Sequence, residues 1–235
     1  MKVDIWSDIM CPFCYIGKRK LETALAQFPD RDKVELVWHS FQLDPTIEYV
    51  PGRNLHEYLA ERKGQSLEWS VNVHGQMTKT AAAEGLTYNF EKAVIANSFD
   101  AHRLIQLAKT HQLGDAMEER LFKAYFTDGE NMGDHDTLVR IGSETGIPAT
   151  EISDMLKSGA YTAEVKKDIA QAEAYGISGV PFFVLNDKYG ISGAQPAEVF
   201  LDGLQHAWKE YEQTTTITAI GNTAGATCTP DGVCE

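Results

Sequence analysis

The sequence predicts an α/β fold in which a central sheet carries helices on both faces and a large helical block interrupts the sheet. Three observations support this prediction. Two N-terminal stretches alternate apolar and polar residues, the middle hundred-odd residues repeat apolar residues at helical spacing, and an apolar strand-like run returns near residue 180. If the helical block is an excursion, the outer segments form one sheet whose apolar strands are buried on both sides.

The first forty residues are predicted to run strand, helix, strand. Lys2 to Trp6 (KVDIW) and Lys33 to Phe41 (KVELVWHSF) alternate in the manner of half-buried strands. Between them, Pro12 to Phe28 has apolar side chains three and four residues apart, which predicts a helix. Pro12 suits the first helical position because the N–H that proline lacks would have no partner there.

From about Asp44 the spacing of apolar residues becomes helical, and turn compositions such as Thr127 to Gly133 (TDGENMG) separate the segments. The helical spacing is found in four stretches, which are Asn97 to Leu113, Met117 to Tyr125, Leu138 to Ile141, and Tyr161 to Tyr175. A helical block therefore fills the middle of the chain.

Strand character returns in Gly179 to Leu185 (GVPFFVL), and a turn leads to a second short strand at Tyr189 to Ser192. A last helix begins near Pro196. The predicted domains are a discontinuous sheet-containing domain of residues 1–44 and 176–212, an inserted helical domain of residues 45–175, and a flexible tail of residues 213–235 whose linker is small and polar.

Charge and composition exclude several classes of function. The formal net charge of −13 over 235 residues opposes binding to the phosphates of nucleic acid. The N-terminus lacks the apolar run of a signal peptide, and no window of the chain is apolar enough to span a membrane. The expected location is therefore the cytoplasm, where static disulfides are rare and a cysteine pair is more often chemical than structural.

Cys11 and Cys14 form a CPFC motif between the first strand and the first helix. At a helix start the unpaired N–H groups and the helix dipole favour negative charge, so the first thiol is expected to ionise easily and to attack disulfides. Cys14 lies one turn further along the same face, where it can resolve a mixed disulfide formed by Cys11.

Two other interpretations of this pair are weaker. A structural zinc site needs four Cys or His ligands, and the histidines show no paired spacing, so four sulfurs would require the tail cysteines Cys228 and Cys234. We expect no metal site. Inert buried thiols fit poorly with a proline at the helix start and a strand directly before it.

Val180-Pro181 opens the apolar strand near the C-terminus. Proline cannot donate a hydrogen bond to a neighbouring strand, so it belongs at the first position of a strand or on an edge. Simple strand initiation explains this placement, and a cis peptide bond is one way to make the entry sharp.

Taken together, these motifs resemble the DsbA-like branch of the thioredoxin superfamily, and in particular its cytosolic FrnE type. The resemblance covers residues 1–212 and rests on four segments, which are DIWSDIMCPFCYIGK, NSFDAHRLIQLAK, ERLFKAYFTDGEN and GISGVPFFVLNDKYGISGAQ. It implies a thioredoxin-like fold split by a helical insertion, with Cys11 as nucleophile, Cys14 as resolving thiol, and a cis-Pro181 packed against them.

The predicted function is a thiol-disulfide oxidoreductase or disulfide isomerase acting on protein or peptide substrates, as a monomer or homodimer. Backbone of Val180 would pair with an extended substrate peptide. Pro12 and Phe13, which lie between the cysteines, would also contact the substrate. No cofactor is expected beyond glutathione as a possible redox partner.

Two alternatives stay open. Kappa-class glutathione transferases and 2-hydroxychromene-2-carboxylate isomerases are similar over the same regions but usually carry serine in place of the first cysteine. A glutathione-dependent enzyme acting on a small aromatic substrate is therefore the first alternative. The second is a metal-binding redox sensor that uses Cys228 and Cys234, whose intervening turn residues can close a small disulfide ring. The same tail pair could instead relay electrons to or from the CPFC motif.

Trp6, Ser7, Asp8, His39 and Phe41 are expected near the Cys11 edge of the sheet. Core packing explains the two aromatic residues. A nearby Asp8 would raise the pKa of a thiol, and His39 would lower it.

Overall fold

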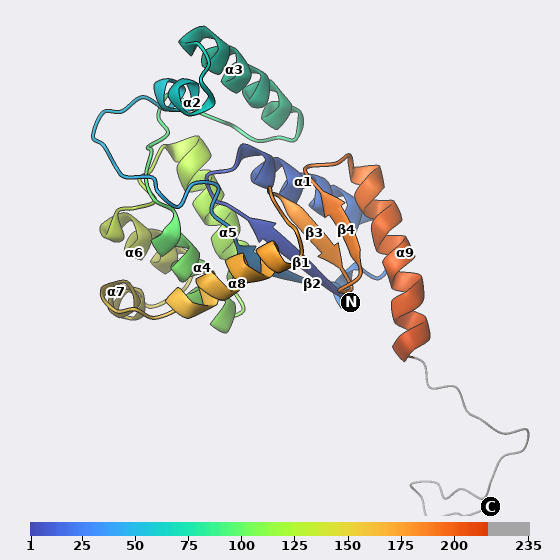
Figure 1. The fold of residues 1–235 in the computed structure, drawn as a ribbon. Coiled ribbons are helices and arrows are strands. Elements are labelled where there is room, and N and C mark those ends of the chain that lie inside the picture. Colours follow the sequence, from blue (N-terminus) through green and yellow to red (C-terminus); the bar gives the residue numbers. More distant parts are fainter. Residues whose placement is uncertain (216–235) are drawn as a thin grey trace, which may run out of the picture.

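The computed structural model describes residues 1–215, and in it one four-stranded sheet lies among helices (Figure 1). The strands are β1 (Lys2–Ser7), β2 (Glu35–Ser40), β3 (Phe182–Leu185) and β4 (Tyr189–Ser192). Their order across the sheet is β2-β1-β3-β4. β1 runs parallel to β2 and antiparallel to β3, and β3 and β4 form an antiparallel hairpin. Residues 2–40 and residues 182–192 thus contribute to a single sheet, as predicted.

Helices before, between and after the strands complete the described part of the chain. They are α1 (Pro12–Gln27), α2 (Leu55–Lys63), α3 (Leu67–Ala83), α4 (Phe99–Thr110), α5 (Gly114–Lys123), α6 (His135–Glu144), α7 (Ala149–Lys157), α8 (Thr162–Ala174) and α9 (Ala197–Thr215), with a short 3-10 turn at Arg31–Lys33 and a π-turn at Ala124–Asp128. All helices from α2 to α8 fall between β2 and β3. This is the predicted helical insertion, and the exact domain boundaries remain a prediction.

The alternation along β1 sends side chains to two covered faces. Ile5 belongs to the main core together with Leu21 of α1 and Phe200 of α9, and α1 packs directly on α9. Trp6 points the other way, into a small cluster with Ala172 of α8. Both faces of the central strand are therefore covered, and all residues of β1 after Lys2 are buried, including the polar Asp4 and Ser7.

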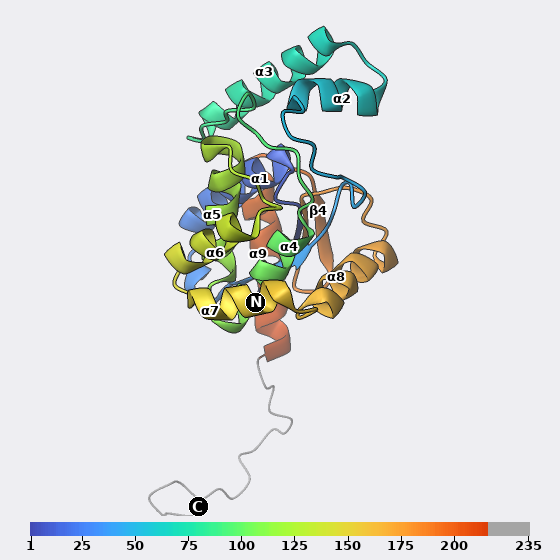
Figure 2. The same ribbon diagram turned by 90° about the vertical axis from the view of Figure 1, so that its left-hand side faces the viewer.

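The α2–α3 hairpin projects from the rest of the molecule, as two views at right angles show (Figures 1 and 2). Along its two helices the buried side chains are small or polar, and they are His56, Ala60, Ser70, His74 and Ala81. The hairpin is held at His56 and His74, whose Nδ1 atoms lie 2.6 Å apart.

Candidate active site

The CPFC motif forms the turn from β1 into α1. The Cys11 N–H donates to the Asp8 carbonyl at 2.9 Å, and Cys11 is the N-cap of α1 with an extended backbone. Pro12 takes the first helical position, as predicted, and the Cys14 N–H donates to the Cys11 carbonyl at 3.0 Å. The Cys11 side chain therefore stands at the positive end of the α1 dipole, which favours an anion there.

Residue 180 brings the distant part of the chain to this turn. The Cys11 thiol donates to the Val180 carbonyl oxygen at 3.4 Å, and the Val180–Pro181 peptide bond is cis. The cis bond implied by the resemblance is thus confirmed. Two segments separated by 169 positions in the sequence meet at the Cys11 sulfur.

Gly17 allows α1 to approach the cis-proline. A Cβ at residue 17 would lie 3.0 Å from Cγ of Pro181 and 3.2 Å from Cζ of Phe183, which is closer than such atoms normally come. The absence of a side chain at this one helical position lets the proline ring pack against the helix that carries both thiols.

Both thiols are free, and they differ in their surroundings. Cys14 is only 1% exposed, and burial, followed by the neighbouring Cys11, raises its pKa well above the ordinary value. The Asp8 backbone and the Ser7 side chain act in the opposite direction but do not outweigh burial. Cys14 is therefore a protonated thiol until something nearby accepts its proton.

The residues between the two cysteines face different ways. Phe13 is 43% exposed beside the Cys11 turn. The Pro12 carbonyl accepts a hydrogen bond of 2.7 Å from the hydroxyl of Tyr88, a residue that precedes α4. The Tyr88 contact ties the CPFC turn to the helical insertion.

Asp8 and His39 have other partners than a thiol. The Asp8 carboxylate accepts hydrogen bonds from the N–H groups of Met10 and Leu43, at 3.1 and 2.8 Å, and so shapes the loop around the motif. Both ring nitrogens of His39 are occupied by Asp168 and Asp4, at 2.8 and 2.7 Å. The expectation that His39 tunes the thiols is wrong, because its ring points to the α8 face of the sheet.

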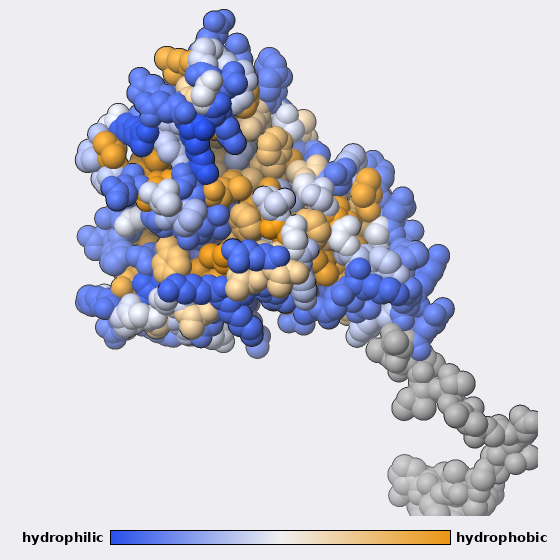
Figure 3. Space-filling model, in the orientation of Figure 1, coloured by the Kyte–Doolittle hydropathy of each residue, from blue (hydrophilic) through white to orange (hydrophobic). Residues whose placement is uncertain are grey.

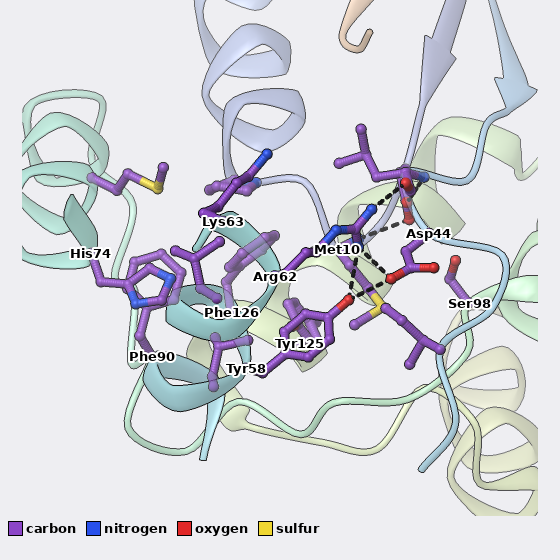
Figure 4. A pocket seen from close by; sticks show the side chains of 17 residues that line it. Met10, Asp44, Tyr58, Arg62, Lys63, His74, Phe90, Ser98, Tyr125 and Phe126 are labelled. Atoms are coloured by element: carbon purple, nitrogen blue, oxygen red, sulfur yellow. Dashed lines mark hydrogen bonds and ion pairs between the residues drawn. The ribbon is translucent and has the colours of Figure 1, made fainter. Parts of the chain in front are cut away.

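A cavity of about 200 Å³ lies next to the motif (Figure 4). Met10 and Pro12 line one side, and residues of the α2–α3 hairpin and Phe126 line others. Its lining is largely apolar, with a polar cluster at which Asp44 accepts hydrogen bonds from Tyr58 and Arg62. A largely apolar cavity therefore lies beside the CPFC turn.

Residues 2–205 match the family model described as a DSBA-like thioredoxin domain. The chain belongs to the DsbA-like thioredoxin family. The match spans the sheet, the CPFC motif and the whole helical insertion, so the resemblance to the DsbA-like branch of the thioredoxin superfamily is confirmed.

Individual members of the DsbA-like family and its neighbours show how far the similarity extends. A probable DsbA oxidoreductase from Streptomyces coelicolor is 39% identical, with a TM-score of 0.85 over 100% of this chain and 98% of its own. The uncharacterized protein YwbO of Bacillus subtilis is 27% identical over 84% of this chain and 92% of its own length. A 2-hydroxychromene-2-carboxylate isomerase shares the fold, with a TM-score of 0.65 at 14% identity over 92% of this chain and 100% of its own.

A metal-binding cluster and a membrane-spanning helix are the two features that would bear on the alternatives drawn from the sequence. Within residues 1–215, no group of three or more His, Cys, Asp or Glu side chains is arranged to hold a metal ion. Cys228 and Cys234 lie outside the described residues. Among helices of the described part, none is long and apolar enough to cross a membrane.

Two residues of the site were not singled out from the sequence. Gly17 carried a readable signal, since an isolated glycine within a helical pattern often marks a close packing contact. Tyr88 carried none, because the segment around it has no periodic pattern and its contact with Pro12 spans 76 positions.

Proposed function

We propose that this protein is a cytoplasmic thiol-disulfide oxidoreductase or disulfide isomerase that acts on protein or peptide disulfides through Cys11. The observation that carries the proposal is the position of the Cys11 sulfur, at the N-terminus of α1 and 3.4 Å from the carbonyl oxygen that precedes cis-Pro181. The narrower assignment to the FrnE type and the cytoplasmic location are parts of the same proposal.

The reaction uses both thiols in order. The Cys11 thiolate attacks one sulfur of the substrate disulfide, a mixed disulfide forms, and the other substrate sulfur leaves as a thiolate. In reduction, Cys14 then attacks the Cys11 sulfur, the Cys11–Cys14 disulfide forms, and the second substrate thiolate leaves with the electron pair. In isomerisation, a thiol of the substrate displaces Cys11 instead, and the enzyme dithiol is regenerated without net oxidation.

The surface around the motif suits an unfolded or extended polypeptide. Exposed large apolar side chains at this turn are Phe13 in the motif and Leu43, which lines the cavity beside Pro12. Figure 3 shows apolar residues gathered across the middle of the face presented in Figure 1. Val180 is half-buried, and its backbone would pair with substrate backbone, which gives affinity with little sequence preference.

Two assays test the proposal, with the wild type and the variants Cys11→Ser and Cys14→Ser. Insulin reduction should require both thiols, whereas the repair of scrambled ribonuclease should require Cys11 and tolerate Cys14→Ser. Equal activity of wild type and Cys11→Ser in both assays would refute the proposal. A glutathione-dependent isomerase or transferase would instead keep its activity in Cys14→Ser and bind glutathione without oxidising the dithiol.

A further inference from the structure

The N-terminus of α1 keeps one backbone donor free beside the Cys11 side chain. Cys11 is the N-cap residue, and the side chain at this position normally accepts a hydrogen bond from the N–H of the second or third helical residue. These residues are Phe13 and Cys14. The Cys14 N–H already donates to the Cys11 carbonyl at 3.0 Å, whereas the Phe13 N–H makes no hydrogen bond within residues 1–215. Phe13 therefore carries the backbone donor that is left for the N-cap side chain.

The thiol form of Cys11 does not use this donor. Its S–H group donates to the Val180 carbonyl oxygen at 3.4 Å, and the sulfur accepts no cap hydrogen bond. A thiolate has no hydrogen to donate, and a charged acceptor forms stronger hydrogen bonds than a neutral thiol does. When Cys11 ionises, the Phe13 N–H is the partner that the N-cap position offers to its sulfur.

Tyr88 holds the other end of the same peptide group. Its hydroxyl donates to the Pro12 carbonyl at 2.7 Å, and this carbonyl and the Phe13 N–H belong to one planar peptide unit. A hydrogen bond to the carbonyl polarises the unit and so strengthens the N–H as a donor. The same bond fixes the plane of the peptide and with it the direction of the N–H. Tyr88 thus acts on the free donor from the far side of the peptide group.

The π-turn Ala124–Asp128 holds Tyr88 in place. The rings of Tyr88 and Phe126 are stacked, with centroids 4.5 Å apart and 20° between their planes. Asn89, the next residue, donates from its backbone N–H to the Phe126 carbonyl at 2.7 Å and from its side chain to the Thr127 carbonyl at 2.6 Å. Turns of this kind are rare and are frequently found at functional sites. The anchored ring leaves the Tyr88 hydroxyl little freedom to leave its acceptor.

The surroundings of the Tyr88 hydroxyl keep it protonated. Tyr88 is 4% exposed, and burial, followed by the charges of Cys11 and Cys14 as thiolates, raises its pKa well above the ordinary value. Tyr15 adds to this shift and Arg19 opposes it. The hydroxyl therefore stays a hydrogen-bond donor at neutral pH, whatever the charge on the sulfurs.

We propose that Tyr88 is a positioning residue, which stabilises the thiolate of Cys11 through the Pro12–Phe13 peptide group. A more stable thiolate favours the reduced dithiol over the Cys11–Cys14 disulfide. Removing the Tyr88 hydroxyl should therefore make Cys11 ionise at higher pH and make the disulfide harder to reduce. This inference rests on the dithiol function proposed above.

The first test measures the ionisation of Cys11 alone. The rate of alkylation by iodoacetamide, which reacts with the thiolate, is followed as a function of pH in the full-length parent chain and in Tyr88→Phe. In both proteins the other cysteines are replaced by serine, and these are Cys14, Cys228 and Cys234.

Tyr15→Phe is the matched control. Tyr15 is also buried, and its ring is stacked near that of Tyr88 with centroids 6.2 Å apart. Its hydroxyl donates to Glu119 at 2.6 Å and not to the CPFC turn. The control therefore removes a buried hydroxyl close to the motif and leaves the Pro12 carbonyl with its partner.

The midpoint of the alkylation profile should move to higher pH by about half a unit in Tyr88→Phe, since polarisation by one hydrogen bond changes the next bond by a fraction of its strength. The midpoint of Tyr15→Phe should match the parent. A residue that only supports the fold would leave the midpoint where it is, because the alkylation is measured on the folded protein.

The second test measures the equilibrium of the dithiol with glutathione and glutathione disulfide, in chains that keep Cys11 and Cys14. At a pH above both midpoints, a shift of half a unit corresponds to about a threefold change in the equilibrium constant, which should favour the protein disulfide in Tyr88→Phe. Equal midpoints in Tyr88→Phe and parent would overturn the inference, and so would equal shifts in Tyr88→Phe and Tyr15→Phe. Failure of the dithiol function has a different signature, because the parent chain would then form no Cys11–Cys14 disulfide.

Discussion

Replacing Glu118 by glutamine should make the stability of the folded protein less dependent on pH. Burial raises the pKa of Glu118 from 4.5 to about 7. Between these values the folded protein holds a proton that the unfolded chain has lost, so the free energy of unfolding falls as the pH rises through this window. At about 1.4 kcal/mol per pKa unit, the loss is about 3 kcal/mol and is complete a little above pH 7.

Glutamine has nearly the same shape and does not ionise, so the variant should lack this loss. Urea unfolding of the reduced wild type and of the reduced variant, at pH 4.5 and at pH 8, measures how much the free energy of unfolding falls between these pH values. The stability of Glu118→Gln relative to wild type should increase by about 3 kcal/mol from the lower to the higher pH. Glu173→Gln, which removes an exposed acid of α8, is the control and should show no such change. The reasoning is refuted if both variants behave alike.

Three further substitutions test other contacts. Gly17→Ala should destabilise the protein by about 1–3 kcal/mol in thermal unfolding, because the added Cβ would press on Pro181. Gly75→Ala, whose Cβ would meet open space, is the control and should not destabilise it. Equal effects of the two substitutions would refute the packing argument. Asp168→Asn should cost about 3–5 kcal/mol in urea unfolding because it breaks a buried pair with His39, and a loss below 1 kcal/mol would contradict this. Tyr88→Phe should cost about 1 kcal/mol by the same measurement, and unchanged stability would show that its hydrogen bond to Pro12 adds nothing.

The sheet was predictable because the pattern of apolar and polar residues along each strand indicates which of its faces are buried. β1 and β2 alternate, and β3 is a continuous apolar run, so each was located to within a few residues. The α2 and α3 helices were not located individually. Their buried faces consist of histidine, serine and alanine, so no apolar stripe reveals them. α7 was also missed, since its nine residues give the stripe few turns in which to repeat.

The two thiols were predictable from their spacing and from the proline at the helix start. The complete burial of Glu118 was not predictable, because glutamate on a helix is ordinarily a surface residue. The one available signal is register, since Glu118 lies three and four residues before the buried Leu121 and Phe122. The contact between Cys11 and Val180 joins residues 169 positions apart, and spacing rules do not reach that far without the family resemblance.

The small and polar buried side chains of the α2–α3 hairpin have a consequence for the cavity beside Pro12. Proteins open locally in cooperative units, and units that bury little apolar surface open at the lowest free energy. This hairpin forms one wall of the cavity beside Pro12, whereas the opposite side belongs to the rigid turn after β1. We infer that amide hydrogens of α2 and α3 exchange with solvent well before those of β1. Local opening of the hairpin, and not the closed dimensions of the cavity, would then set the size of a group that can enter beside Met10 and Pro12.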